Sequence, residues 1–109
     1  MECIMNAKDL AIARKFKELI INKVPVRDVK VFGSRARGTA VNESDLDVLV
    51  TVTNLNHEID HYISDCAWEA GFPEDVVIVP IVVDQHEIED GPLSESPFIR
   101  TIQREGISI

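Results

Sequence analysis

The sequence predicts an α/β fold for a single domain over residues 1–109. Segments with the apolar spacing of helices alternate along the chain with short apolar segments typical of strands. A chain of 109 residues has room for one hydrophobic core. With 45% hydrophobic and 28% charged residues, the composition is typical of folded globular proteins and unlike that of disordered ones.

The first predicted elements are a helix and a strand. Apolar residues at helical spacing predict a helix from residue 6 to about residue 24, with Asn6 as its N-cap and Pro25 as its end. Apolar and polar side chains then alternate over residues 26–32, which predicts a strand that runs directly into Gly33-Ser34.

The middle of the chain predicts a second strand and a second long helix. A short helical turn over residues 34–38 and a polar loop over residues 39–44 lead to residues 46–52, which are nearly continuously apolar. Such a strand is typical of the centre of a sheet. An apolar stripe over residues 55–70 then predicts a helix that is capped by Asn54 or Asn56 and ends at Gly71 in the left-handed conformation.

The last third of the chain predicts one more strand and a short helix. Residues 75–83 are rich in valine and isoleucine, but Pro80 cannot donate a ladder hydrogen bond, so we expect an edge strand or a bulge. Residues 85–92 are less regular. Ser96 and Pro97 are typical of an N-cap and a first helical residue, and the helix should end near Gly106.

Charge and hydropathy exclude several classes of partner. The formal net charge of −8 excludes long-range attraction to nucleic acid or to an anionic membrane, so a nucleotide must be recognised locally. No apolar run approaches the roughly 20 residues that span a bilayer, and the N-terminus lacks the pattern of a signal peptide, which predicts the cytoplasm. Cys3 and Cys66 lack the spacing of a zinc site and are interpreted as reduced thiols, with Cys66 packed on a helix.

One motif carries the chemistry of the chain. Gly33-Ser34-Arg35-Ala36-Arg37-Gly38 is followed, after six residues, by Asp45-Leu46-Asp47 at the start of a predicted strand. Because alternate residues of a strand point to the same face, the two carboxylates should lie side by side and need a cation. Mg²⁺ fits, since it binds carboxylate oxygens and keeps coordination positions for water and triphosphate oxygens.

This motif resembles the signature of the nucleotidyltransferase superfamily that includes DNA polymerase beta, and most closely that of the minimal nucleotidyltransferase (MNT) proteins paired with HEPN proteins. The resemblance implies a small mixed β-sheet of three to four strands with helices largely on one face. It implies Asp45 and Asp47 as catalytic metal ligands, and Gly33 and Ser34 as residues that hold the triphosphate. Arg35 and Arg37 are further candidates for phosphate contact, or side chains that are solvated or paired with a local acid.

The sequence differs from the family pattern at the third carboxylate. In relatives it stands within the strand after the second long helix, whereas residues 76–83 contain no acid. The nearest candidates are Asp75 and Asp84, of which Asp75 is the preferred catalytic residue. His57 and His61 have helical spacing but no third ligand, so a solvated helix face is expected.

The resemblance implies a magnesium-dependent enzyme that transfers a nucleoside monophosphate, such as AMP, from a nucleoside triphosphate to a hydroxyl of a protein or small molecule. Such a protein can act as the antitoxin of a HEPN/MNT pair, and a HEPN-type partner or a self-dimer would complete the site. The alternative is a catalytically weak or inactive MNT-like module that neutralises a HEPN-type ribonuclease by direct contact. Trp68, Tyr62 and Phe72 are expected in the core or in a partner contact.

Overall fold

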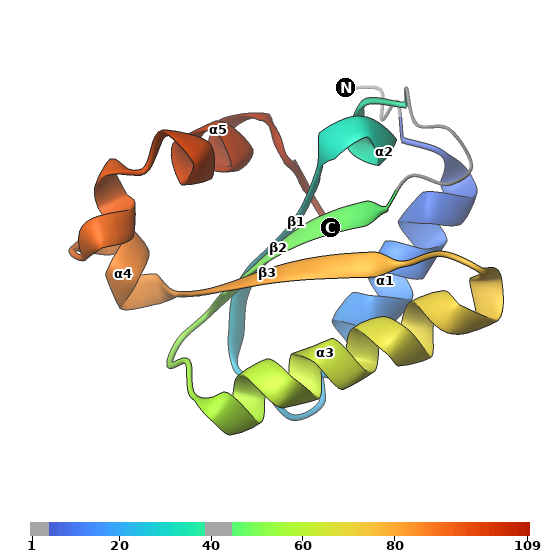
Figure 1. The fold of residues 1–109 in the computed structure, drawn as a ribbon, viewed down its shortest axis with the longest axis horizontal. Coiled ribbons are helices and arrows are strands. Elements are labelled where there is room, and N and C mark those ends of the chain that lie inside the picture. Colours follow the sequence, from blue (N-terminus) through green and yellow to red (C-terminus); the bar gives the residue numbers. More distant parts are fainter. Residues whose placement is uncertain (1–4, 39–44) are drawn as a thin grey trace.

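A four-stranded mixed sheet forms the centre of the molecule (Figure 1). The computed structural model describes residues 5–38 and 45–109. The strands are β1 (Val26–Phe32), β2 (Leu46–Val52), β3 (Ile78–Asp84) and β4 (Ile107–Ser108), in the order β3-β2-β1-β4. The pair β2 and β3 is parallel, and β1 is antiparallel to both β2 and β4. The central position predicted for β2 and the edge position predicted from Pro80 are both confirmed.

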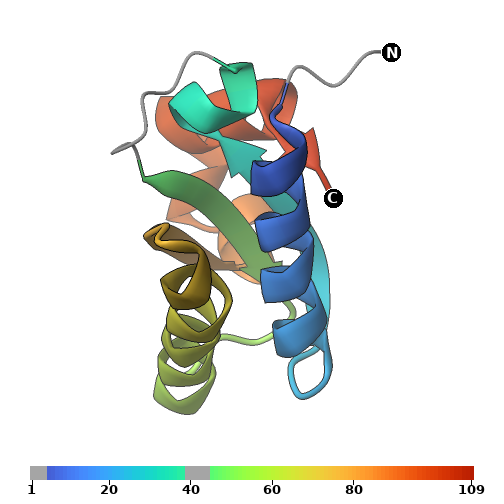
Figure 2. The same cartoon turned by 90° about the vertical axis from the view of Figure 1, so that its right-hand side faces the viewer.

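The two long helices cover one face of this sheet. Figure 2 shows α1 (Ala7–Ile21) and α3 (His57–Gly71) side by side on that face. On the other face lies α5 (Pro97–Glu105), and α4 (Gln85–Glu89) follows directly after β3 (Figure 1). The predicted mixed sheet with helices largely on one face is therefore confirmed for the long helices, while a shorter helix packs on the opposite face.

Strand β2 is apolar along nearly its whole length because both of its faces are buried. Val48 and Val50 point into the core formed with α1 and α3. Leu49 points the other way, into a smaller core with Ile99 and Ile102 of α5. Since side chains alternate along a strand, Asp47 shares its face with Leu49, so the predicted site lies on the face that carries α5.

The helix caps follow the sequence signals. The Asn6 side chain accepts a hydrogen bond from the Lys8 backbone N–H at 2.7 Å, and Ser96 accepts one from Ile99 at 3.3 Å. Of the two candidates for α3, the cap is Asn56, which accepts a hydrogen bond from the Ile59 N–H at 2.8 Å.

The prediction of a left-handed residue at Gly71 is wrong. Gly71 has φ −91°, and the chain continues into the 3-10 turn η1 (Phe72–Glu74), which ends at Asp75 with φ 57°. A glycine is needed at position 71 for a different reason, because a Cβ atom there would lie 2.3 Å from the carbonyl oxygen of Val76. The backbone of the returning chain approaches too closely for a side chain.

The segment after β3 is more regular than expected, since it contains α4 and the 3-10 turn η2 (Pro92–Glu95). Cys66 is a buried free thiol, as predicted, whereas Cys3 and the predicted loop 39–44 lie outside the described residues. Within residues 5–38 and 45–109, no helix combines the length and the apolar character needed to cross a membrane.

Candidate active site

The Gly33-Ser34 pair opens the short helix α2 (Gly33–Arg37) directly at the end of β1. Gly33 has φ 80° and Gly38, at the end of the helix, has φ 73°, so both glycines adopt the left-handed conformation. Phe32 occupies the N-cap position and provides no side-chain hydrogen bond to the first turn. The N-terminal end of α2 therefore has the polarity that attracts an anion.

Asp47 lies directly against this glycine. The antiparallel register pairs Phe32 with Asp47, and the Asp47 side chain extends over the turn that follows. A Cβ atom built on Gly33 would lie 2.5 Å from Oδ2 of Asp47, which is closer than two such atoms can approach. A glycine is thus required at position 33 for two reasons. The backbone is left-handed there, and the Asp47 carboxylate occupies the space that a side chain would need.

The carboxylates of Asp45 and Asp47 are coupled electrostatically. The pKa of Asp47 is raised, first because the carboxyl group is partly buried and second because the negative charge of Asp45 lies nearby. Asp45 itself is exposed just before β2 begins. The predicted pair is therefore brought together beside the glycine turn, in an arrangement that a bound cation would relieve.

The residue of β3 beside Asp47 is Val79, according to the parallel register of the two strands. Asp75 lies four residues earlier, exposed, at the end of η1 and before β3 begins. Within the part of the chain that the structure describes, no group of three or more His, Cys, Asp and Glu side chains lies close enough together to hold a metal ion. Asp75 is thus not assembled with Asp45 and Asp47 into a three-carboxylate site.

The second candidate for the third carboxylate, Asp84, lies at the opposite end of the sheet. It pairs with Val52, five residues beyond Val79, which is roughly 16 Å further along the strand. Its carboxylate accepts hydrogen bonds from the N–H groups of Leu55 at 3.0 Å and His86 at 2.7 Å. These bonds lower the pKa of Asp84, and its role is to cap α4 and to hold the loop before α3.

The two arginines of the motif have different environments. Arg35 is buried, and its guanidinium forms an ion pair with Asp9 of α1 at 2.6 Å, with both side chains less than a tenth exposed. This contact joins α2 to α1 and indicates a structural role for Arg35. Arg37, the last residue of α2, is exposed. Ser34 is partly buried on the same helical turn.

Sequence reasoning missed Asp9. It precedes Arg35 by 26 residues and stands in the first turn of α1, where an acidic residue is usually solvated. The only signal in the sequence was an acid at a position adjoining the apolar stripe of α1, which does not identify a partner.

A cleft of about 490 Å³ adjoins Gly33, between α2 and α5. Phe32 and Phe98, which both line it, form an edge-to-face pair with ring centroids 5.9 Å apart. Arg37 and Glu105 are the charged residues of its lining. Because Gly33 is part of its lining, the cleft is continuous with the glycine turn.

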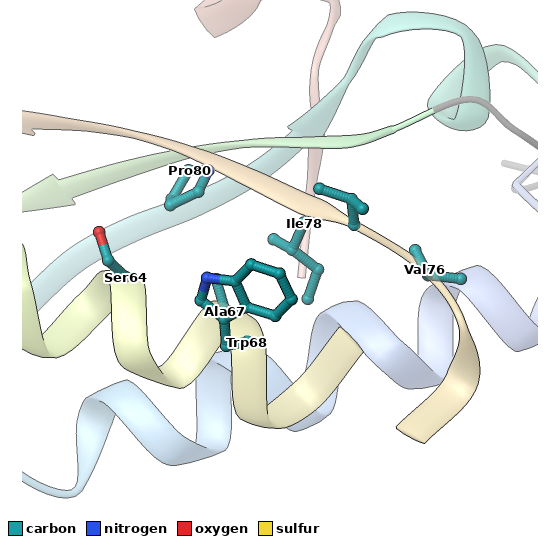
Figure 3. A pocket seen from close by; sticks show the side chains of 7 residues that line it. Ser64, Ala67, Trp68, Val76, Ile78 and Pro80 are labelled. Atoms are coloured by element: carbon teal, nitrogen blue, oxygen red, sulfur yellow. The ribbon is translucent and has the colours of Figure 1, made fainter. Parts of the chain in front are cut away.

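A second hollow lies between α3 and the edge strand β3 and is mainly apolar (Figure 3). Its lining includes Trp68 of α3 and Ile78 and Pro80 of β3, which alternate with Val79 and so point to the face opposite Asp47. The hollow is therefore separate from the carboxylate pair.

Trp68 and Phe72 do not belong to the core. Their side chains are 65% and 73% exposed and lie against each other, with ring centroids 6.2 Å apart. Tyr62 is partly buried and donates a hydrogen bond to the Leu19 carbonyl at 2.8 Å, which joins α3 to α1. His57 and His61 are exposed on α3, as the solvated-face interpretation predicted.

The mixed sheet, with a Gly-Ser turn after β1 and an Asp-x-Asp pair at the start of β2, fits the nucleotidyltransferase signature that the sequence resembles. The model of the nucleotidyltransferase domain family matches residues 13–107, and the chain belongs to this family.

Relatives occur in Methanocaldococcus jannaschii. The chain is 36% identical over 83 residues to "Putative protein adenylyltransferase MJ0128", covering 72% of this chain and 80% of that protein. It is 39% identical over 46 residues to "Putative protein adenylyltransferase MJ1379". That second match spans 42% of this chain and only 46% of the length of the relative.

Solved structures share the fold. A "putative nucleotidyltransferase" from Sulfolobus solfataricus superposes with a TM-score of 0.56 at 25% identity, over 73% of this chain and 70% of the other. A structure described as "the toxin-antitoxin with AMP-PNP" superposes with a TM-score of 0.58 at 19% identity, over 88% of this chain and 70% of the other. The predicted fold class is confirmed by these likenesses.

Proposed function

We propose that this protein is a magnesium-dependent nucleotidyltransferase that transfers AMP from ATP to a hydroxyl group of a protein or small-molecule acceptor. The observation that carries the proposal is the close approach of the Asp47 carboxylate to Gly33, where a Cβ atom would lie 2.5 Å from Oδ2. It places an electrostatically coupled carboxylate pair directly beside a turn suited to phosphate oxygens. The names of the two M. jannaschii relatives support adenylate as the transferred group.

The donor set fits one Mg²⁺ ion. Asp45 and Asp47 supply hard carboxylate oxygens, and the exposure of Asp45 leaves room for water and phosphate oxygens. The raised pKa of Asp47 shows that its charge is disfavoured without a counter-ion, which a divalent cation would supply. When bound, the ion would neutralise charge on the phosphates of the nucleotide.

In the proposed reaction the acceptor oxygen forms a bond to the α-phosphorus of ATP and loses its proton to the surrounding water. The bond between the α-phosphorus and the oxygen that bridges to the β-phosphate breaks, and pyrophosphate leaves. Gly33 and Ser34 would hold the phosphates that leave, with Arg37 at the edge of the adjoining cleft as a further phosphate contact. These residues contribute positioning and charge stabilisation.

The reaction is tested with ATP labelled at either the α- or the γ-phosphorus, using the protein itself and a purified HEPN-type protein as acceptors. Nucleotidyl transfer predicts magnesium-dependent incorporation from the α-labelled ATP and none from the γ-labelled ATP. Asp47→Asn should abolish incorporation. Asp75→Asn is the matched control and should retain it, because Asp75 lies outside the carboxylate pair. Incorporation from γ-labelled ATP, or incorporation from α-labelled ATP that persists in Asp47→Asn, contradicts the proposal.

A second candidate function rests on a different observation, the exposed aromatic pair Trp68 and Phe72. Exposed neighbouring aromatic side chains are typical of protein interfaces. A module of this fold could neutralise a HEPN-type ribonuclease as an antitoxin by direct contact through this pair. Such a role is compatible with transfer of AMP to the same partner.

Inhibition of a HEPN-type ribonuclease separates the two functions. Direct contact predicts that inhibition persists without ATP and in Asp47→Asn, and that the double variant Trp68→Ala/Phe72→Ala loses it at least tenfold. Inhibition that requires ATP and Asp47 would instead assign it to transfer. The stability of the double variant serves as the control, since both side chains are more than 60% exposed and their loss should leave the fold intact.

A further inference from the structure

Strand β3 presents apolar side chains on the face of the sheet that carries the carboxylate pair. Val79 pairs with Asp47 and Ile81 pairs with Leu49 in the parallel register. Ile78 is buried in the core with α3, so Val79, the next residue, points to the opposite face, where Asp47 lies. The Val79 side chain is 37% exposed and is not covered by the helices of that face.

Position 79 is the place on β3 from which a side chain would most easily reach Asp47. Neighbouring strands lie about 4.8 Å apart, and side chains paired on one face of a sheet are adjacent. Valine offers no ligand atom and no proton acceptor there. The residue of β3 that borders Asp47 is therefore apolar.

We propose that Val79 limits this site to a single divalent cation, so that the protein binds its nucleotide without a second metal ion. The inference rests on the proposed function, because it concerns the same carboxylate pair. A site for two cations needs additional anionic ligands, and the described residues provide no third one near Asp45 and Asp47. An aspartate at position 79 would add a carboxylate beside Asp47 and create the missing ligand set.

The experiment counts Mn²⁺ ions bound per chain in the presence of a saturating ATP analogue that cannot be hydrolysed, by equilibrium dialysis and electron paramagnetic resonance. The wild-type protein should bind one ion per chain and Val79→Asp two. Val79→Asn is the matched control, because it has nearly the same size as aspartate without the charge, and it should bind one. In Val79→Asp the two ions should show the spin coupling of neighbouring Mn²⁺ centres.

Each outcome is informative. A wild-type count of two, or a count of one in Val79→Asp, would overturn the inference while leaving the proposed function in place. A wild-type count of zero would contradict the proposed function itself. The exposure of position 79 favours folding of the variants, which circular dichroism checks, and Val79→Glu reaches the same space if the aspartate variant does not fold.

Discussion

The carboxylate pair should cost the protein stability when no cation is bound, and Asp47→Asn should therefore stabilise it. Asp47 is partly buried against Gly33 beside the charge of Asp45, and both conditions raise its pKa. Replacement by the neutral amide of the same shape removes the buried charge and the repulsion. The clearance between the side chain and Gly33 changes little, because asparagine and aspartate have nearly the same size.

The magnitude follows from the separation of the two charges. Residues two apart in an extended chain are roughly 7 Å apart, and two like charges at that distance repel by about 0.6 kcal/mol in water and about 2.4 kcal/mol at an effective dielectric of 20. In the unfolded chain, the repulsion between the two carboxylates keeps the smaller value that applies in water. The folded state of a partly open site lies between these limits, so we expect Asp47→Asn to gain about 1 kcal/mol.

Thermal unfolding without divalent cations measures this gain, which should raise Tm by roughly 4 to 8 °C in a domain of this size. Because folding raises the pKa of Asp47, the folded state loses stability as pH rises through that pKa, and the loss is absent where Asp47 is protonated in both states. The difference between variant and wild type should be largest at neutral pH and vanish below about pH 4.

The control variant is Glu18→Gln, because Glu18 is exposed on α1 and its replacement also removes one negative charge from the net charge of −8. Asp45→Asn should give a smaller gain than Asp47→Asn, because Asp45 is exposed and loses only the repulsion. A variant Asp47→Asn that is no more stable than wild type at neutral pH, or a gain that persists at acid pH, would refute the reasoning.

The remaining predictions concern glycines and the buried ion pair. Gly33→Ala should lower the free energy of unfolding by about 1–3 kcal/mol and weaken magnesium-dependent nucleotide binding. Gly38→Ala, with a similar left-handed φ, should lower only the free energy of unfolding. Thermal unfolding and calorimetric titration with nucleotide distinguish the two variants. Asp9→Asn should lower the free energy of unfolding in urea by about 3 kcal/mol, because it leaves the buried Arg35 guanidinium beside a neutral partner. A decrease of less than about 1 kcal/mol would contradict a structural role for this ion pair. Gly71→Ala should lose at least about 1 kcal/mol, since its Cβ would meet a carbonyl oxygen at 2.3 Å; wild-type stability would contradict this close approach.

The features that the sequence predicted are those with a local cause. Apolar periodicity predicted α1, α3 and the first three strands, and Asn6 and Ser96 identified helix caps because their side chains bond to backbone within three residues. The continuous apolar run of β2 predicted a strand buried on both faces, and Pro80 predicted the edge.

The features that it could not predict depend on register or on contacts between distant segments. Strand β4 has only two residues and exists through its pairing with β1. The contact of Asp47 with Gly33 follows from the β1 and β2 register, and the ion pair of Arg35 with Asp9 joins residues far apart in sequence. Likewise, only the β2 and β3 register shows that Val79 is the residue of β3 that lies beside Asp47.

Calorimetric titration of the wild-type protein and Asp47→Asn with ATP, each with and without Mg²⁺, tests the central claim most directly. The account predicts binding by the wild-type protein that depends on Mg²⁺, and its loss in the variant although the variant is folded and more stable. Equal binding by both proteins, or binding that is indifferent to Mg²⁺, would contradict the assignment of the Asp45 and Asp47 pair as a metal and nucleotide site.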